Sequence, residues 1–282
     1  MGGCAEVGVR GPTFLTPACL LSMKLKVGCQ LDYRTSQNTP LILLLRPRHG
    51  PDQSIIQEEF KVAPSVPITE YLDLYGNSCQ RLVSPQGLFS VVSSAIVETR
   101  ELVEVNDQAN FTLIQDLPSA ALIYLLPSRY CESDKLNSKA FEITGSIDNG
   151  YQMVEAIRQW VRANITYEYD HSTSSTSALD TLQARKGVCR DLSHLAIALC
   201  RSISIPARFV VGYLYRLDPM DLHAWFEAYL DGQWYTFDAT QPVVSGARVV
   251  LAHGRDAADV ATATYFGDIV LDNMYVYVEQ AE

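Results

Sequence analysis

Long apolar runs, an excess of basic residues and paired cysteines are all missing from this sequence of 282 residues. No stretch approaches the roughly 20 apolar residues that a membrane-spanning helix needs, so we expect no membrane span. With 22 Lys and Arg against 32 Asp and Glu, the formal net charge is −10. That charge gives no general attraction to phosphate backbones or anionic lipid, so we expect no nucleic-acid partner.

The seven cysteines are odd in number, widely scattered and without a Cys-x-x-Cys pair. Such spacing argues against a disulfide scaffold and favours a reducing compartment, so we expect a cytoplasmic protein. Residues 1–22 lack the cluster of Lys or Arg that opens a secretory signal. We interpret residues 1–22 as a leader that is not part of the fold, because regular sequence begins only at Met23.

The composition is that of a globular protein, with 48% hydrophobic and 19% charged residues and enough length for two domains. From Met23 to Leu126, short runs of β-forming residues are separated by prolines and turn-forming pairs. This spacing predicts an antiparallel β-sandwich-like N-terminal domain over residues 23–126, followed by a polar linker over 127–146. The apolar run at 120–126 is expected to be a buried strand. The other predicted strands are Lys24–Tyr33, Leu41–Arg46, Ile55–Val62, Tyr71–Leu74, Gln80–Ser84, Leu88–Glu104 and Phe111–Ile114.

From residue 147 onward the pattern changes to helices followed by strands. Apolar residues from Val154 to Ile165 recur on one helical face, Ser177 is placed to cap a short helix from Ala178 towards Arg185, and a third helix is predicted over Cys189–Ile203. We therefore predict an α+β second domain over residues 147–282. Its predicted strands are Ala207–Arg216, Leu222–Leu230, Gln233–Asp238 and Ile269–Val278.

Cys189 follows Gly187 and Val188 and occupies the first turn of its predicted helix. Unpaired N–H groups and the positive end of the helix dipole favour a thiolate there. The same N–H groups can stabilise an oxyanion that develops on a substrate carbonyl. The simpler interpretation is a buried cysteine, the commonest fate of this residue type, and the position alone does not exclude it.

A predicted hairpin gives Cys189 two partners. Asp231-Gly232 is a strong signal for a two-residue turn, which would pair Leu230 with Gln233. With a side-chain period of two, His223 and Asp238 then become diagonal neighbours on one face, with Cα atoms roughly 7–8 Å apart. A carboxylate in that place can hold an imidazole in one tautomer and support its charged form. We predict a catalytic triad of Cys189, His223 and Asp238.

Ordinary interpretations of these residues remain open. A histidine on a strand is often a hydrogen-bonded core residue, and Asp238 could simply be a turn former at a strand end. Cys189, His194, His223 and Asp238 are also zinc-ligand types, but Cys189 and His194 are five residues apart and point about 140° from each other on a helix. We expect neither a metal nor a cofactor.

The segments around these residues resemble the bacterial transglutaminase-like superfamily. The nucleophile region is matched by 178–182 running into 187–195, the histidine strand by 223–229, and the aspartate strand by 234–240. One departure is Ala239, where the family often has proline. The resemblance covers roughly residues 147–240, and residues 23–126 are similar, more weakly, to the β-rich region that often precedes this core.

The resemblance implies a papain-like α+β core and thiol acyl chemistry on a carboxamide or peptide. Cys189 would attack the carbonyl and form a thioester, His223 would take and return the proton, and Asp238 would orient His223. Tyr167 is a candidate for a second oxyanion donor, and His194 falls on a motif position off the reactive face, which favours a structural role.

Three functions fit these residues. The favoured one is a hydrolase, either a cysteine protease or an amidase, acting on a peptide or protein substrate. An alternative is a transglutaminase, which shares the thioester and differs only in passing the acyl group to an amine. A third is a non-catalytic peptide-binding or assembly module with a vestigial site.

Overall fold

The computed structural model describes residues 21–282. The predicted leader therefore lies almost entirely outside the described residues. No helix within residues 21–282 is long and apolar enough to cross a membrane.

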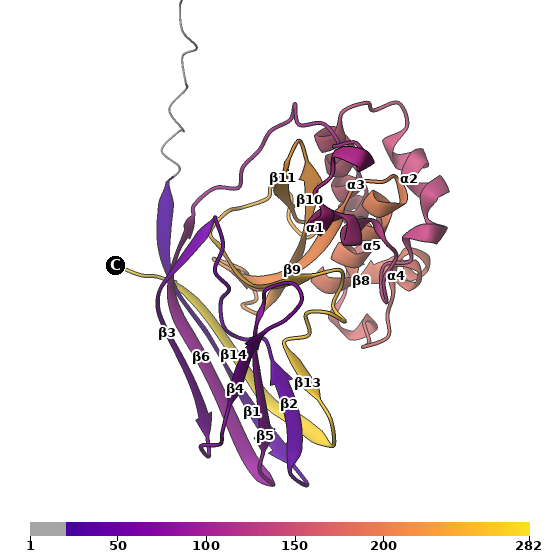
Figure 1. The fold of residues 1–282 in the computed structure, drawn as a ribbon. Coiled ribbons are helices and arrows are strands. Elements are labelled where there is room, and N and C mark those ends of the chain that lie inside the picture. Colours follow the sequence, from indigo (N-terminus) through magenta and orange to yellow (C-terminus); the bar gives the residue numbers. More distant parts are fainter. Residues whose placement is uncertain (1–20) are drawn as a thin grey trace, which may run out of the picture.

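Two four-stranded antiparallel sheets form the sandwich, each built from three strands of the N-terminal half and one strand from the end of the chain (Figure 1). Burial alternates residue by residue along β2 and, most regularly, along β6, as expected for strands that bury one face. Leu25, Val27, Leu41 and Val91 are fully buried between the two sheets. The first sheet has the order β14 (Ile269–Gln280), β1 (Ser22–Thr35), β6 (Gly87–Arg100) and β3 (Gln53–Ala63). The second has the order β13 (Ala263–Tyr265), β2 (Thr39–Leu43), β5 (Ser78–Ser84) and β4 (Thr69–Leu72).

The last strand belongs to this first sheet. β14 pairs with β1 from Leu25↔Gln280 to Thr35↔Ile269, so the chain returns to the N-terminal sandwich after completing the second domain. The prediction that residues 147–282 form one domain differs from the structure in this respect. The strand predicted at Ile269–Val278 is confirmed as β14. A period-two pattern does not, however, specify which distant strand it will pair with.

Two predicted strands, Phe111–Ile114 and the run at 120–126, are not strands in the structure. Residues 114–125 form the 3₁₀ turns η1 (Ile114–Asp116) and η2 (Ile123–Leu125) around the short helix α1 (Ser119–Leu122). A short apolar run does not distinguish a buried strand from a buried helical turn, and Pro118 immediately before α1 favours the helical start.

The predicted linker 127–146 also contains structure, namely η3 (Ser133–Lys135) and the helix α2 (Asn137–Thr144), which packs on α3 and α5.

The second domain is an α+β core, as predicted. Asn149 caps α3 (Gly150–Asn164), and Ser177 with Asp180 forms a capping box on α4 (Ala178–Ala184). Helix α5 (Cys189–Ser202) is buried along most of its length and packs on β9 and β10. The antiparallel sheet has the order β11 (Gln233–Phe237), β10 (His223–Leu230), β9 (Ala207–Leu214) and β12 (Arg248–Gly254). Smaller elements are β7 (Thr166–Tyr167), the 3₁₀ turn η4 (Tyr169–His171) and β8 (Lys186–Gly187).

Strand β12 joins the core to the sandwich. The backbone N–H of Arg48 donates to the carbonyl of Val250 at 3.1 Å, and the side-chain oxygen of Gln53 accepts from the N–H of Val250 at 2.7 Å. The hydroxyl of Thr99 donates to the carbonyl of Arg248 at 2.7 Å. Figure 1 shows the resulting arrangement, with the helices on one side of the core sheet and the sandwich next to its other side.

Candidate active site

Cys189 is the first residue of α5, as predicted. The side chain of Asp191 accepts a hydrogen bond from the N–H of Val188 at 3.0 Å and so caps the helix start. This close approach requires glycine at position 187, because a Cβ there would lie 2.7 Å from the Cβ of Asp191. The chain is thereby fixed so that the first turn of α5 presents Cys189.

Exposure separates Cys189 from the other cysteines. Within residues 21–282 the five cysteines are free thiols, and Cys189 is half-buried whereas Cys29, Cys79, Cys131 and Cys200 are buried. Burial raises the pKa of Cys131 to about 12, which keeps that thiol protonated. Among the described cysteines, only Cys189 is accessible enough to meet a substrate.

The hairpin register is confirmed. Leu230 pairs with Gln233 and Phe226 with Phe237, and Asp231 and Gly232 both have positive φ, at 47° and 89°. Positive φ at both positions is the requirement of the tight turn that Asp-Gly predicts.

This register brings the predicted pair together. His223 Nε2 and Asp238 Oδ2 are 2.8 Å apart, and their side chains are 3% and 0% exposed. The thiol of Cys189 is a neighbour of this imidazole and contributes to the raised pKa of His223. The three residues predicted from the sequence are therefore adjacent.

Asp238 has more partners than the sequence suggested. Its Oδ2 also accepts from Arg248 Nη2 at 2.9 Å, and its Oδ1 accepts from the backbone N–H and the hydroxyl of Thr240 at 2.9 and 2.7 Å. Burial alone would raise the pKa of Asp238, but the charge of Arg248 and the bonds from His223 and Thr240 outweigh it and hold this pKa well below its usual value. Asp238 therefore carries its negative charge in a fully buried position.

Neither Arg248 nor the role of Thr240 was predicted from the sequence. The spacing Asp238-x-Thr240 is a usable signal, because a carboxylate at a strand end often bonds the backbone two residues later. Arg248 carries no such signal, since it lies on β12, which is separated from β10 by β9 in the sheet.

The surroundings of His223 favour its protonated form. Burial lowers the pKa of His223, but the hydrogen bonds to Asp238 and Cys189 and the charge of Asp238 raise it to about 9. At neutral pH the pair is therefore an imidazolium facing a carboxylate. Such a pair can stabilise a neighbouring thiolate and supply a proton to a leaving group.

Tyr167 lies beside Cys189 because β7 pairs in parallel with β8, with Tyr167 opposite Gly187. Burial and the neighbouring Cys189 and Tyr169 raise the pKa of Tyr167, while a hydrogen bond with the backbone N–H of Cys189 opposes that shift. The hydroxyl of Tyr167 thus remains protonated at neutral pH and lies next to the N–H that was expected to face an oxyanion.

His194 lies in a different environment. It is fully buried, its Nε2 accepts from the N–H of Ala257 at 3.1 Å, and its ring stacks on Tyr130 with centroids 5.1 Å apart. Burial, helped by the nearby charge of Arg190, lowers the pKa of His194 to about 3, so the ring is neutral. These contacts fit the predicted structural role.

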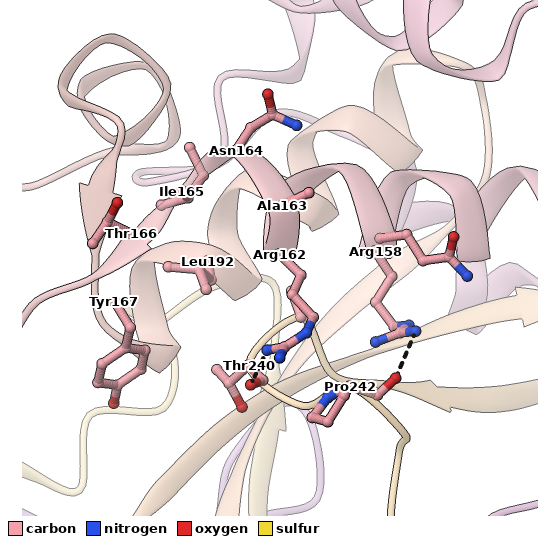
Figure 2. Close-up of a pocket in the computed structure, with 12 residues that line it drawn as sticks. Arg158, Arg162, Ala163, Asn164, Ile165, Thr166, Tyr167, Leu192, Thr240 and Pro242 are labelled. Atoms are coloured by element: carbon pink, nitrogen blue, oxygen red, sulfur yellow. Dashed lines mark hydrogen bonds between the residues drawn. The ribbon is translucent and has the colours of Figure 1, made fainter.

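A groove of about 710 Å³ borders this cluster (Figure 2). Its lining includes Tyr167, Leu192, Thr240 and Pro242. Arg162 points across the groove and donates from Nη1 to the carbonyl of Thr240 at 2.7 Å. Because Tyr167 contacts Cys189 and Thr240 contacts Asp238, the groove ends beside the candidate active site.

Comparisons with known proteins identify a family and a similar solved structure. The family model described as "Transglutaminase-like superfamily" matches residues 137–239, which run from α2 to the residue after Asp238. The crystal structure of a proposed cysteine protease from Cytophaga hutchinsonii superposes with a TM-score of 0.87 and 38% identity, covering 93% of this chain and 92% of that one.

Two curated relatives are uncharacterised proteins. One from Mycobacterium leprae is 29% identical over 236 residues, covering 77% of this chain and 82% of its own. One from Mycobacterium tuberculosis is 33% identical over 126 residues, covering 38% of this chain and 40% of its own. The matched family and the similar structure support a general thiol-dependent catalytic role. With a solved relative that is alike over nearly the whole length of both chains, this protein belongs to the transglutaminase-like superfamily.

Proposed function

We propose that this protein is a thiol-dependent acyl hydrolase, a cysteine protease or amidase that acts on peptide-like amide bonds. The observation that carries the proposal is the buried His223–Asp238 pair, 2.8 Å apart, next to a half-exposed cysteine at a helix start. A buried ionised pair is costly unless it is fully bonded, and its location beside an accessible thiol gives it a chemical use.

In the proposed reaction the thiolate of Cys189 attacks the substrate carbonyl while the proton resides on His223. The carbonyl oxygen becomes an oxyanion next to the N–H of Cys189 and the hydroxyl of Tyr167, both of which can donate to it. His223 then gives its proton to the departing amine as the C–N bond breaks, and a thioester remains on Cys189. Water attacks the thioester with His223 as base, which releases the acid and restores the thiol.

Asp238 has the orienting role in this scheme. Its four hydrogen bonds, from His223, Arg248 and Thr240, leave the carboxylate little freedom to rotate. A fixed acceptor holds one nitrogen of His223 and leaves the other free to face Cys189.

The groove offers a place for the substrate chain. Its volume of about 710 Å³ is ample for several atoms on either side of a scissile bond, and its walls mix apolar carbon with polar groups of Arg162, Asn164 and Thr240. We propose that a peptide or protein substrate lies along this groove with its reactive carbonyl near Cys189.

Alkylation of the thiol tests the proposal directly. Iodoacetamide is applied from pH 5 to pH 9, and modification at Cys189 is located and timed by mass spectrometry. Glutathione is the reference thiol, because the other described cysteines are buried and would react slowly whatever the function. If Cys189 is activated by His223, we expect it to react at pH 6 at least about tenfold faster than glutathione.

Two histidine variants make the test specific. His223→Asn removes the partner of the thiol and is expected to abolish the fast reaction. His171→Asn changes an exposed histidine in η4 and should leave it unchanged. Equal rates for Cys189 and glutathione at pH 6, or a fast reaction that survives His223→Asn, would overturn the proposal and favour a vestigial site.

Transfer to an amine is the alternative fate of the thioester. A fluorescent primary amine, offered together with a glutamine-containing protein, distinguishes the two outcomes. Hydrolysis leaves the amine unincorporated, whereas stable incorporation that requires Cys189 identifies a transglutaminase.

A further inference from the structure

A second cavity lies between the sandwich and the core sheet. It has a volume of about 530 Å³ and is lined by residues 48–53, 99–100 and 102–104 of the sandwich and by parts of β10, β11 and β12. It shares no lining residue with the groove beside Cys189. Trp225, Glu227 and Tyr229 face it, whereas the alternate residue Phe226 is fully buried and pairs with Phe209, which contacts His194 of α5. The cavity is therefore on the sheet face opposite α5.

Arginines dominate the charged wall of this cavity. Arg100 pairs with Asp52 and Glu104, and Arg208 pairs with Glu227. Arg48 bonds only neutral oxygens in the described chain, including Asn77 Oδ1 at 3.1 Å. Arg248 shares its carboxylate, Asp238, with His223. The lining thus has four arginines against three carboxylates, Asp52, Glu104 and Glu227.

The charges of Arg208 and Arg48 act on a half-buried histidine of the wall. His253 also lines the cavity, and burial together with the charges of Arg208 and Arg48 lowers its pKa to about 2. His253 is therefore neutral, because burial disfavours its charged form and the charges of the two arginines add to that effect.

Two hydrogen-bond donors in the wall have no acceptor. Arg248 Nη1 and Trp225 Nε1 are buried and lack a partner within residues 21–282. Their side chains are in contact, with the guanidinium of Arg248 4.9 Å from the ring centroid of Trp225. Leaving a buried donor unsatisfied costs about 1–3 kcal/mol, so an acceptor that reached both would be bound favourably.

We propose that this cavity is a binding site for a small anionic molecule that carries a carboxylate or phosphate group. Arg48 and Arg208 supply the charge, and small movements of the wall bring the anion to Arg248 and Trp225. Guanidinium groups suit these anions because their planar donors match two oxygens at once. A volume of about 530 Å³ fits a molecule of metabolite size rather than a single ion.

Arg248 connects this cavity to the candidate active site. Nη2 of Arg248 bonds Asp238, and Nη1 is the unsatisfied donor. An anion bound to Nη1 would therefore weaken the bond between Nη2 and Asp238. Occupancy should therefore change the pH dependence of Cys189 alkylation, a consequence that rests on the proposed function. Binding itself does not depend on catalysis.

Calorimetric titration of the full chain with citrate and with pyrophosphate tests the site, each against sodium chloride at equal ionic strength. We expect saturable binding of at least one probe, and the stronger one shows whether carboxylate or phosphate is preferred. Arg48→Gln and Arg208→Gln should each weaken binding at least tenfold. Arg34→Gln, which changes an arginine of β1 whose side chain is 67% exposed, should not weaken it.

Two outcomes overturn the site: neither probe binds the wild-type chain, or both cavity variants bind as tightly as wild type. Circular dichroism confirms that each variant is folded, and Arg208→Gln suffices if Arg48→Gln, which also loses bonds to Asn77, does not fold. Cys189→Ala should bind the probe as tightly as wild type. Failure of the proposed function would therefore appear in the alkylation experiment alone, and failure of the anion site in the titration.

Discussion

Among the described residues, the buried polar side chains of the β-sandwich are all uncharged, whereas the α+β core buries arginine, aspartate and histidine. The sandwich group is Thr35, Thr39, Gln53, Asn77, Gln80, Ser84, Ser93 and Thr99. The core group includes Arg158, Asp191, His194, Arg201, His223, Asp238, Arg248 and Asp256. A buried charge is tolerated only when it is paired and hydrogen-bonded, so the core must meet geometric demands that the sandwich does not.

Some of the buried charge in the core is structural. Arg201 donates to the carbonyl oxygens of Leu126, Ala207 and Arg255, and so ties three separate segments together. Asp238 differs, because its partner His223 faces a half-exposed thiol. Buried charge therefore marks the chemical region of this protein, and contact with an accessible group distinguishes the buried charges with a chemical role from those with a structural one.

The largest expected effect comes from neutralising Asp238. In Asp238→Asn the buried Arg248 loses its carboxylate, which should cost about 3–5 kcal/mol of unfolding free energy in urea titrations. His223 also loses its orienting charge, so alkylation of Cys189 at pH 6 should slow by roughly 10²-fold or more. Asp231→Asn, at the exposed turn where asparagine tolerates a positive φ, is the matched control and should change neither value.

A cavity made in the interior of the sandwich should destabilise the protein without changing the reactivity of Cys189. Leu41 is fully buried, so Leu41→Ala should lower the unfolding free energy by about 2–5 kcal/mol. The folded fraction should alkylate Cys189 at the wild-type rate. A slower rate in folded protein would contradict this separation, because it would show that the sandwich affects the reactivity of the thiol.

The raised pKa of His223 predicts a stability that falls with pH. The folded state keeps this proton up to about pH 9, whereas the unfolded chain releases it near 6.5. The contribution is thus complete below pH 6.5 and is lost as pH rises to 9, by about 3 kcal/mol in total.

Urea unfolding of wild type and His223→Asn at pH 6 and pH 9 isolates this contribution. The stability advantage of wild type should shrink between the two values. An advantage that is constant, or that grows with pH, would show that His223 is not charged in the folded state.

Removing a neutral polar group of the α+β core should have only a small effect on stability, because no buried charge loses its partner. Ser177 caps α4 by accepting from the N–H of Asp180, so Ser177→Ala should cost about 1 kcal/mol. Ser174→Ala, at a neighbouring exposed serine, should cost less, and thermal unfolding of both variants measures the difference.

Local rules in the sequence determined the parts of the site that depend on neighbouring residues. The start of α5 at Cys189 followed from apolar periodicity, and the adjacency of His223 and Asp238 followed from the turn that Asp231-Gly232 imposes. The expected cytoplasmic location and the hydrolytic reaction remain predictions. The family was indicated by the same segments and is now shown.

Only the tertiary structure decided the rest. The pairing of β14 with β1, the packing of α2 on the core and the bond from Arg248 to Asp238 all join segments whose contact depends on the whole chain being folded. Local spacing carries no information about such contacts, because a strand pattern or a lone arginine is compatible with many partners. The sequence therefore determined which three residues would meet, and the tertiary structure decided how Asp238 is held and which cavity lies behind it.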